Sequence, residues 1–257
     1  MRISLIQSEL IWEDPEGNRI KFEQDLLPLK GGSDIIVLPE MFTSGFTMHP
    51  RAVAEPMDGP SMQWMRKMAV HTGAVVTGSL VIERNGRYLN RLVWMKPDGD
   101  YMYYDKRHLF RLAGEEKQYS AGNRRMIFEW RGWRIFPLIC YDLRFPVWSR
   151  RSTLFDYDLL IYVANWPDRR SSAWKKLIPA RAIENQCYVA ALNRIGADGN
   201  GIPHSGDSII VDHAGNPITE APSSKPCVLH AELDIEKLQS FRSDFPFWQD
   251  ADGFEFK

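Results

Sequence analysis

Short apolar runs that each stop at a reactive or polar side chain constrain the fold of this chain most strongly. Such runs are typical of buried strands, and three of them end next to Glu40, Cys140 and Asn165. They span residues 35–38, 135–139 and 159–164. Ligands of open α/β sheets collect at the carboxyl ends of parallel strands. If these strands are parallel, we expect their terminal side chains to share one rim.

The spacing of apolar residues predicts ten strands and only four helices. Asn85-Gly86 lies between two strand-like runs and predicts a tight hairpin turn, and Gly59-Pro60-Ser61 predicts the start of a helix. Pro179 inside the last predicted helix predicts a kink or a new helix start. The predicted strands are 2–8, 34–39, 73–83, 87–95, 101–105, 134–139, 158–164, 186–193, 206–212 and 227–233, and the predicted helices are 15–29, 60–72, 147–155 and 171–185.

Ten strands with so few helices favour two stacked sheets, each with a helical layer outside, over one doubly wound sheet. An eight-stranded (β/α) barrel is the alternative, and the predicted hairpins argue against it. No Gly/Ser-rich or Pro-rich linker divides the 257 residues, so we expect a single domain. The aromatic tail 241–257 is too apolar for a disordered segment, and we expect it to pack on the body or on a second subunit.

Three strand ends deliver a carboxylate, an ammonium and a thiol, namely Glu40, Lys106 and Cys140. Acyl transfer through a thioester needs a nucleophile, a base that activates it and a positive charge beside the oxyanion. Each residue alone also has an ordinary structural interpretation, as a packed thiol or a solvated charge. Their occurrence together favours catalysis. A Cys–His mechanism through His108 is the alternative, although nothing in the sequence pairs that histidine with Cys140.

Composition excludes several classes of function. A net charge of −1 leaves no electrostatic footprint for nucleic acid. Every apolar run is far shorter than the ~20 residues that span a bilayer, and the first residues are typical of a strand and not of a signal peptide. Three cysteines without a C-x-x-C motif indicate a reducing compartment, and we expect Cys187 and Cys227 to be structural. The six histidines show no metal-ligand spacing.

Five ordered motifs around these residues resemble the nitrilase superfamily of carbon–nitrogen hydrolases. The resemblance runs from Arg2 to about Leu233 and implies a four-layer αββα sandwich of two stacked mixed sheets with outer helices. Phe42-Thr-Ser-Gly-Phe46 and Ala164-Asn-Trp-Pro167 are most similar to the ω-amidase branch, as is the aromatic tail. The five motifs are Leu38–Phe42, Asp105–Phe110, Gly114–Gly122, Cys140–Pro146, and Ala180–Asn185 with Asn193–Gly196.

The resemblance implies a role for each catalytic residue. Cys140 is the nucleophile, Glu40 the general base, and Lys106 binds the oxyanion together with the backbone N–H of Tyr141. Glu115 resembles the second glutamate that orients the lysine and the attacking water, with its neighbour Glu116 as the alternative. No metal or organic cofactor is implied.

The implied substrate is a small acid with a distal carboxamide, such as 2-oxoglutaramate or 2-oxosuccinamate. Its carboxylate needs a cation, and Arg144 is the candidate, unless it pairs structurally with Asp142. Trp166 and Phe42 are candidate pocket walls, although aromatic residues are more often core. The resemblance also implies a homodimer. The cysteine usage, net charge and short apolar runs predict a cytoplasmic protein that binds neither nucleic acid nor membrane.

Other functions remain open at this point. Another branch of the superfamily, acting on nitriles, N-carbamoyl amines or deaminated glutathione, uses the same triad. A non-catalytic member serving as a binding protein is a second alternative, and a peroxide-sensing thiol protein is a third.

Overall fold

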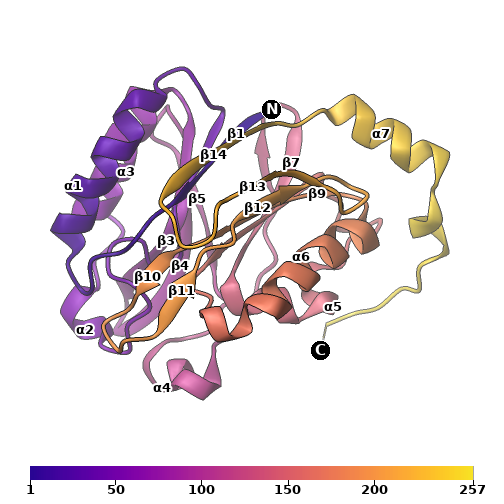
Figure 1. Ribbon diagram of the computed structural model, residues 1–257. Helices are drawn as coiled ribbons and strands as arrows, with labels where there is room; N and C mark the ends of the chain where they lie inside the picture. The colour runs from indigo at the N-terminus through magenta and orange to yellow at the C-terminus, as the bar shows by residue number, and fades with distance from the viewer. Residues whose placement is uncertain (257) are drawn as a thin grey trace.

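The computed structural model describes residues 1–256, and its two six-stranded mixed sheets stack face to face (Figure 1). Within the first sheet, β2 pairs in parallel with both of its neighbours, whereas the other three pairings are antiparallel. The order of its strands is β14 (Cys227–Glu232), β1 (Arg2–Gln7), β2 (Ile35–Val37), β3 (Val75–Arg84), β4 (Arg87–Met95) and β5 (Tyr101–Asp105).

The second sheet repeats this mixed pattern, with β9, β8 and β7 parallel in its centre. Its order is β13 (Pro217–Glu220), β12 (Ile209–Val211), β9 (Tyr188–Asn193), β8 (Leu159–Ala164), β7 (Trp133–Ile139) and β6 (Phe128–Trp130). A small ribbon of β10 (Ile195–Ala197) and β11 (Pro203–Ser205) projects beside the sheets.

Helices cover the outer face of each sheet. Figure 1 shows α1 (Pro15–Leu26) and α3 (Pro60–Thr72) outside the first sheet, and α6 (Ser171–Asn185) outside the second. The predicted αββα sandwich is therefore confirmed, and the barrel alternative is wrong. Short helices occupy the connections: α2 (Pro50–Val53), α4 (Glu115–Gln118), α5 (Pro146–Ser149) and the 3-10 turns at 27–29, 111–113, 140–144, 168–170 and 247–250.

Apolar side chains fill the space between the layers. One cluster joins the inner faces of both sheets and includes Ile3, Trp94 and Leu138. Another lies between the first sheet and its helices, where Met65 and Met68 of α3 are fully buried. Burial of these faces on both sides explains why the strands are nearly continuous apolar runs.

The structure confirms some of the predicted turns and helices and contradicts others. The hairpin between β3 and β4 turns at Asn85 and Gly86, both with positive φ (54° and 73°), as the sequence predicts. The helix predicted over 147–155 is wrong, because the chain leaves the helix at Arg150 and folds into a tight turn in which Ser152 and Phe155 exchange backbone hydrogen bonds. Helix α6 runs through Pro179 without ending there.

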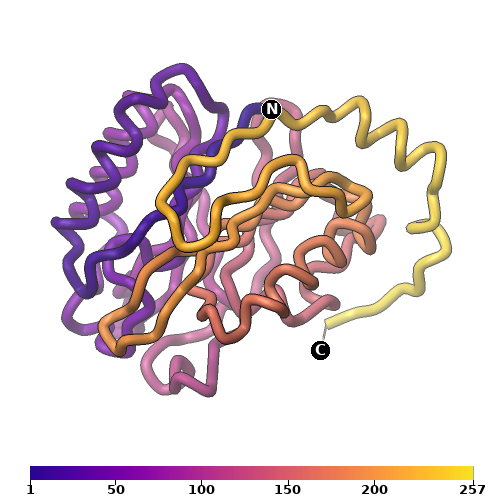
Figure 2. The backbone as a smooth tube through the Cα atoms, in the orientation of Figure 1, coloured from indigo at the N-terminus to yellow at the C-terminus, as the bar shows by residue number. Residues whose placement is uncertain are grey.

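The chain after β14 forms a helix that the sequence analysis missed, α7 (Ile235–Asp244). Beyond α7 the tail curves around the body and comes back toward α5 (Figure 2). Two aromatic contacts accompany this path: the guanidinium of Arg151 lies over the Trp248 ring, and Phe256 meets Trp148 edge to face. In the described part of the chain, no helix combines the length and apolar character needed to cross a membrane.

Candidate active site

Cys140 stands at the end of β7 in a conformation that most residues avoid. Its φ is +43°, in the left-handed region that is uncommon for a residue other than glycine. The strand ends there, and a 3-10 turn over residues 140–144 begins at the same residue. Such outliers persist where the surrounding structure holds them, and they are frequent at active sites. The turn directs the side chain away from the strand path into a cavity.

Asp142 holds that turn from inside the protein. One of its carboxylate oxygens accepts the backbone N–H of Ile139 and the hydroxyl of Tyr104, and the other lies 3.0 Å from the backbone nitrogen of His108 and 2.8 Å from its Nδ1. Both the turn at Cys140 and the segment after Lys106 are thus tied to one buried carboxylate. His108 is therefore a positioning residue for this turn and not a partner of Cys140.

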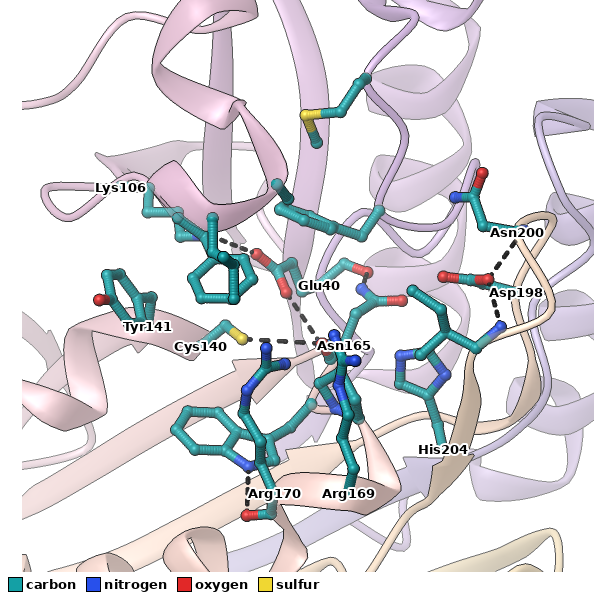
Figure 3. A pocket seen from close by; sticks show the side chains of 18 of the residues that line it. Glu40, Lys106, Cys140, Tyr141, Asn165, Arg169, Arg170, Asp198, Asn200 and His204 are labelled. Carbon is teal, nitrogen blue, oxygen red and sulfur yellow. Dashed lines mark hydrogen bonds and ion pairs between the residues drawn. The ribbon is translucent and has the colours of Figure 1, made fainter.

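Glu40, Lys106 and Glu115 form a buried ion cluster next to the thiol. Figure 3 shows Glu40 and Lys106 of this cluster beside Cys140. The Lys106 ammonium lies 2.8 Å from Glu40 Oε1 and 3.0 Å from both carboxylate oxygens of Glu115. Both carboxylates are fully buried, and Lys106 is 1% exposed. Glu116 is exposed, so only Glu115 meets the lysine. The three strand ends thus meet, although Glu40 and Lys106 follow strands of the first sheet and Cys140 follows a strand of the second.

Two asparagines, Asn90 and Asn165, which the sequence analysis did not include in the site, fix the Glu40 carboxylate. Asn90 Nδ2 donates to Glu40 Oε1 at 2.8 Å. The backbone N–H of Asn165 donates to the other oxygen, Oε2, also at 2.8 Å. Asn165 was visible as a strand end, but Asn90 lies within β4 and carries no local signal. Together with Lys106 these donors leave the carboxylate little freedom to rotate.

Burial sets the protonation of the cluster. Loss of solvent, with the negative charge of Glu40 beside it, holds the pKa of the Cys140 thiol well above its ordinary value, although Lys106 opposes this. Burial also raises the pKa of Glu115, whereas the two carboxylates raise the pKa of Lys106 despite its own burial. The lysine therefore stays charged, and the resting thiol stays protonated. A thiolate preformed in the resting site is therefore not favoured.

The thiol faces a cavity of about 350 Å³, a size that suits a small molecule. Arg144 and Trp166 line it, as predicted. Phe42 does not, and its prediction as a pocket wall is wrong. That ring is fully buried between Phe22 and Trp64 in the core outside the first sheet.

The aromatic walls of this cavity are supplied instead by Trp12, Phe46 and Phe110, together with Trp166. Arg169 and Arg170, just after the Trp166 turn, add positive charge that the sequence analysis missed. Asp198, Asn200 and His204, on and next to the β10–β11 ribbon, close the far side (Figure 3). In residues 1–256, no group of three or more His, Cys, Asp or Glu is arranged to hold a metal ion.

Comparisons with known proteins match nearly the whole chain. The carbon–nitrogen hydrolase family model matches residues 2–243. The chain is 48% identical to the "Omega-amidase YafV" of Escherichia coli K12 over 254 residues, covering 99% of this chain and 98% of that protein. It is 34% identical to a "2-oxoglutaramate amidase" of Bacillus subtilis, covering 96% of each.

A solved structure supports the same fold. The crystal structure of XC1258 from Xanthomonas campestris, described as a CN-hydrolase superfamily protein with an arsenic adduct in the active site, superposes with a TM-score of 0.97. The two chains are 46% identical, and the match covers 100% of this chain and 99% of that one.

Proposed function

Because this chain belongs to the carbon–nitrogen hydrolase family, we propose that it is an amidase that hydrolyses the distal amide of small 2-oxo acids, such as 2-oxoglutaramate and 2-oxosuccinamate, to the acid and ammonia. The observation that carries this proposal is the buried cluster of Glu40, Lys106 and Glu115 beside Cys140, at one end of a cavity whose other charged groups are mostly arginines. The full-length similarity to two proteins named for this activity supports the choice of substrate.

The first step is attack of the Cys140 sulfur on the amide carbonyl carbon. Because the resting thiol is protonated, Glu40 takes the proton as the C–S bond forms, and no thiolate needs to accumulate. The carbonyl oxygen becomes an oxyanion, which the Lys106 ammonium and the backbone N–H of Tyr141 stabilise.

The second step expels ammonia. Glu40, now protonated, gives its proton to the amide nitrogen as the C–N bond breaks, which leaves a thioester on Cys140. Glu40 then takes a proton from a water molecule as the oxygen of that water attacks the thioester carbonyl carbon. This attack forms a second tetrahedral intermediate. Its collapse breaks the C–S bond as Glu40 returns the proton to the Cys140 sulfur, so the acid leaves and the enzyme is restored.

Glu115 serves this cycle without touching the carbonyl. Its two oxygens hold the Lys106 ammonium, and Oε2 also accepts the backbone N–H of Phe110. A lysine held on one side by Glu115 and on the other by Glu40 keeps its charge and its direction while Glu40 changes protonation. We therefore propose that Glu115 positions the oxyanion donor.

The test is ammonia release from 2-oxoglutaramate, 2-oxosuccinamate, glutamine and an aliphatic nitrile, with Cys140→Ala as the control. Fast, Cys140-dependent release from the two oxo-amides alone is the expected result. If none of the four is hydrolysed while iodoacetamide still alkylates Cys140 rapidly, the proposed substrate is wrong. The candidates are then the N-carbamoyl amines and deaminated glutathione.

We also propose a cytoplasmic homodimer built from one catalytic domain per chain. All three cysteines are unpaired, which suits a reducing compartment. Val147 on α5 and Ile183 on α6 are 53% and 50% exposed, and the tail beside them exposes further aromatic rings. Light scattering of the wild type and of Ile183→Glu tests the dimer, and loss of the dimer in the variant is expected.

A further inference from the structure

Three arginines that line the cavity have no acidic partner. Arg144, Arg169 and Arg170 all face it, yet among residues 1–256 no carboxylate lies within ion-pair distance of their guanidinium groups. The two acidic side chains that line the same cavity are engaged elsewhere. Glu40 accepts from Lys106 and Asn165, and Asp198 accepts backbone N–H groups of its own loop. The arginine end of the cavity therefore carries uncompensated positive charge.

Aromatic rings hold two of these side chains in place without neutralising them. The Arg170 guanidinium carbon lies 5.0 Å from the centre of the Phe110 ring, and that of Arg144 lies 4.8 Å from the centre of the Trp166 ring. The backbone of Arg170 is fixed as well, since Trp166 Nε1 donates to its carbonyl at 2.8 Å. Guanidinium groups held over aromatic rings in this way are pre-organised for a planar acceptor.

Arg170 differs from the other two by a buried donor. Its NH1 nitrogen is inaccessible to solvent and has no hydrogen-bond partner in the described part of the chain. A charged donor left unpaired in a buried position is unfavourable unless an acceptor is supplied. Arg169, in contrast, is exposed at the mouth of the cavity, where solvent can satisfy it. Figure 3 shows the side chains of Arg169 and Arg170 rising from the same turn toward the end that holds Cys140.

Resting on the proposed function, we propose that Arg170 is the principal residue that binds the substrate carboxylate, with Arg144 as its second donor. The sequence pointed to Arg144 alone. A carboxylate matches the guanidinium fork and supplies the acceptor that NH1 lacks. Selection for an anionic end then comes from this pair, while Arg169 contributes only long-range attraction. An amide without the carboxylate leaves the Arg170 donor unpaired and is discriminated against for that reason.

The experiment compares 2-oxoglutaramate with 4-oxopentanamide, which has the same chain but a methyl group in place of the carboxylate. For Arg170→Gln we expect kcat/KM for 2-oxoglutaramate to fall about a hundredfold, mostly through KM, and kcat/KM for 4-oxopentanamide to change less than about fivefold. Arg170→Lys keeps the charge but loses the fork, so its loss is expected to lie between the wild type and Arg170→Gln.

Arg169→Gln is the matched control, because it removes the same charge one residue away at an exposed position. Its effect on 2-oxoglutaramate is expected to be about threefold or less and to vanish at high salt. Isothermal titration calorimetry of 2-oxoglutaramate with Cys140→Ala, and with the double variant that also carries Arg170→Gln, measures the affinity contributed by this contact without turnover. Binding is expected to weaken by a similar factor.

Equal losses on both amides in Arg170→Gln, or unchanged affinity in the titration, would overturn the role of Arg170. If either result is obtained while the wild-type enzyme hydrolyses the oxo-amide well, the role of Arg170 is wrong but the proposed function still stands. If the wild type hydrolyses neither compound, and Cys140→Ala does not bind 2-oxoglutaramate, both proposals fail.

Discussion

Replacing Glu115 by glutamine is expected to slow the enzyme and yet make its nucleophile more acidic. The carboxylate holds the Lys106 ammonium through both oxygens and also accepts from Asn90 and from the backbone of Phe110. Glutamine is the same size, but it presents an NH₂ group where one oxygen stood. At least one buried donor then faces another donor, and the negative charge beside Lys106 is lost.

The size of both effects follows from these contacts. A hydrogen bond to a charged group contributes about 1.5–3 kcal/mol, and breaking a buried ion pair costs about 3–5 kcal/mol. In the variant Lys106 still has its ion pair with Glu40, whose Oε1 lies 2.8 Å from the ammonium. We therefore expect a loss in the lower part of this range, about 2–4 kcal/mol of unfolding free energy. In a chain of this length that lowers Tm by roughly 5–15 °C. Disordering an oxyanion donor typically costs about a hundredfold in kcat.

The thiol is expected to move in the opposite direction. The charge of Glu115 is one of the causes that raise the pKa of Cys140, so its removal lowers that pKa. The pH midpoint of iodoacetamide alkylation reports this shift, a coupled ammonia assay gives kcat, and thermal unfolding gives Tm. Glu116→Gln is the matched control, since its side chain is exposed, and all three readouts should stay at wild-type values. A Glu115→Gln enzyme with wild-type kcat, or with a higher alkylation midpoint, would refute the role given to Glu115.

Four other substitutions test the site and the core. Lys106→Met is expected to lower kcat by more than a hundredfold in a folded protein, and near-wild-type turnover would contradict its oxyanion role. Phe42→Ala should lower the unfolding free energy by about 3–5 kcal/mol in denaturant titrations with KM unchanged, whereas Phe46→Ala should change KM at little cost in stability. Burial, with the charge of Arg194, lowers the pKa of His204 from 6.5 to about 4, so protonation of the unfolded chain should remove about 3 kcal/mol of stability as pH falls from 6.5 to 4. This part of the pH dependence should be absent in His204→Gln, and an unchanged slope would show that another group titrates.

The strand ends were predictable because periodicity and chemistry coincide there. An apolar run that stops at a reactive side chain needs no knowledge of distant residues, and Glu40 and Cys140 each carry that signal. Lys106 directly follows a strand-like run, Tyr101–Asp105. The count of strands against helices likewise predicted two sheets. Periodicity does not show which sheet each strand joins. The strand ends were therefore expected to share one rim, whereas in the structure strands of both stacked sheets supply the site.

Residues that act through long-range contacts were missed for a related reason. Asn90 is one polar residue within a long strand, and its importance depends on Glu40, fifty positions away. Phe42, two residues after Glu40, was predicted to be a pocket wall. The turn at Met41, with a φ of +44°, instead sends the Phe42 side chain toward α1 and α3. Phe46, four residues later, reaches the cavity instead.

The protonation of the resting thiol also bears on the peroxide-sensor alternative. Sensor cysteines react as exposed thiolates, and their reactivity rises as their pKa falls. Cys140 is 9% exposed, and burial and the neighbouring carboxylates hold its pKa high. In the proposed mechanism, such a thiol is activated only when Glu40 can take its proton, as an electrophile arrives at the Lys106 end of the cavity. If this mechanism holds, the cluster that favours attack on an amide should also protect the sulfur from oxidation between turnovers. Inactivation by hydrogen peroxide should therefore be slow in the wild type and faster in Glu115→Gln, and equal rates would indicate that burial alone protects the thiol.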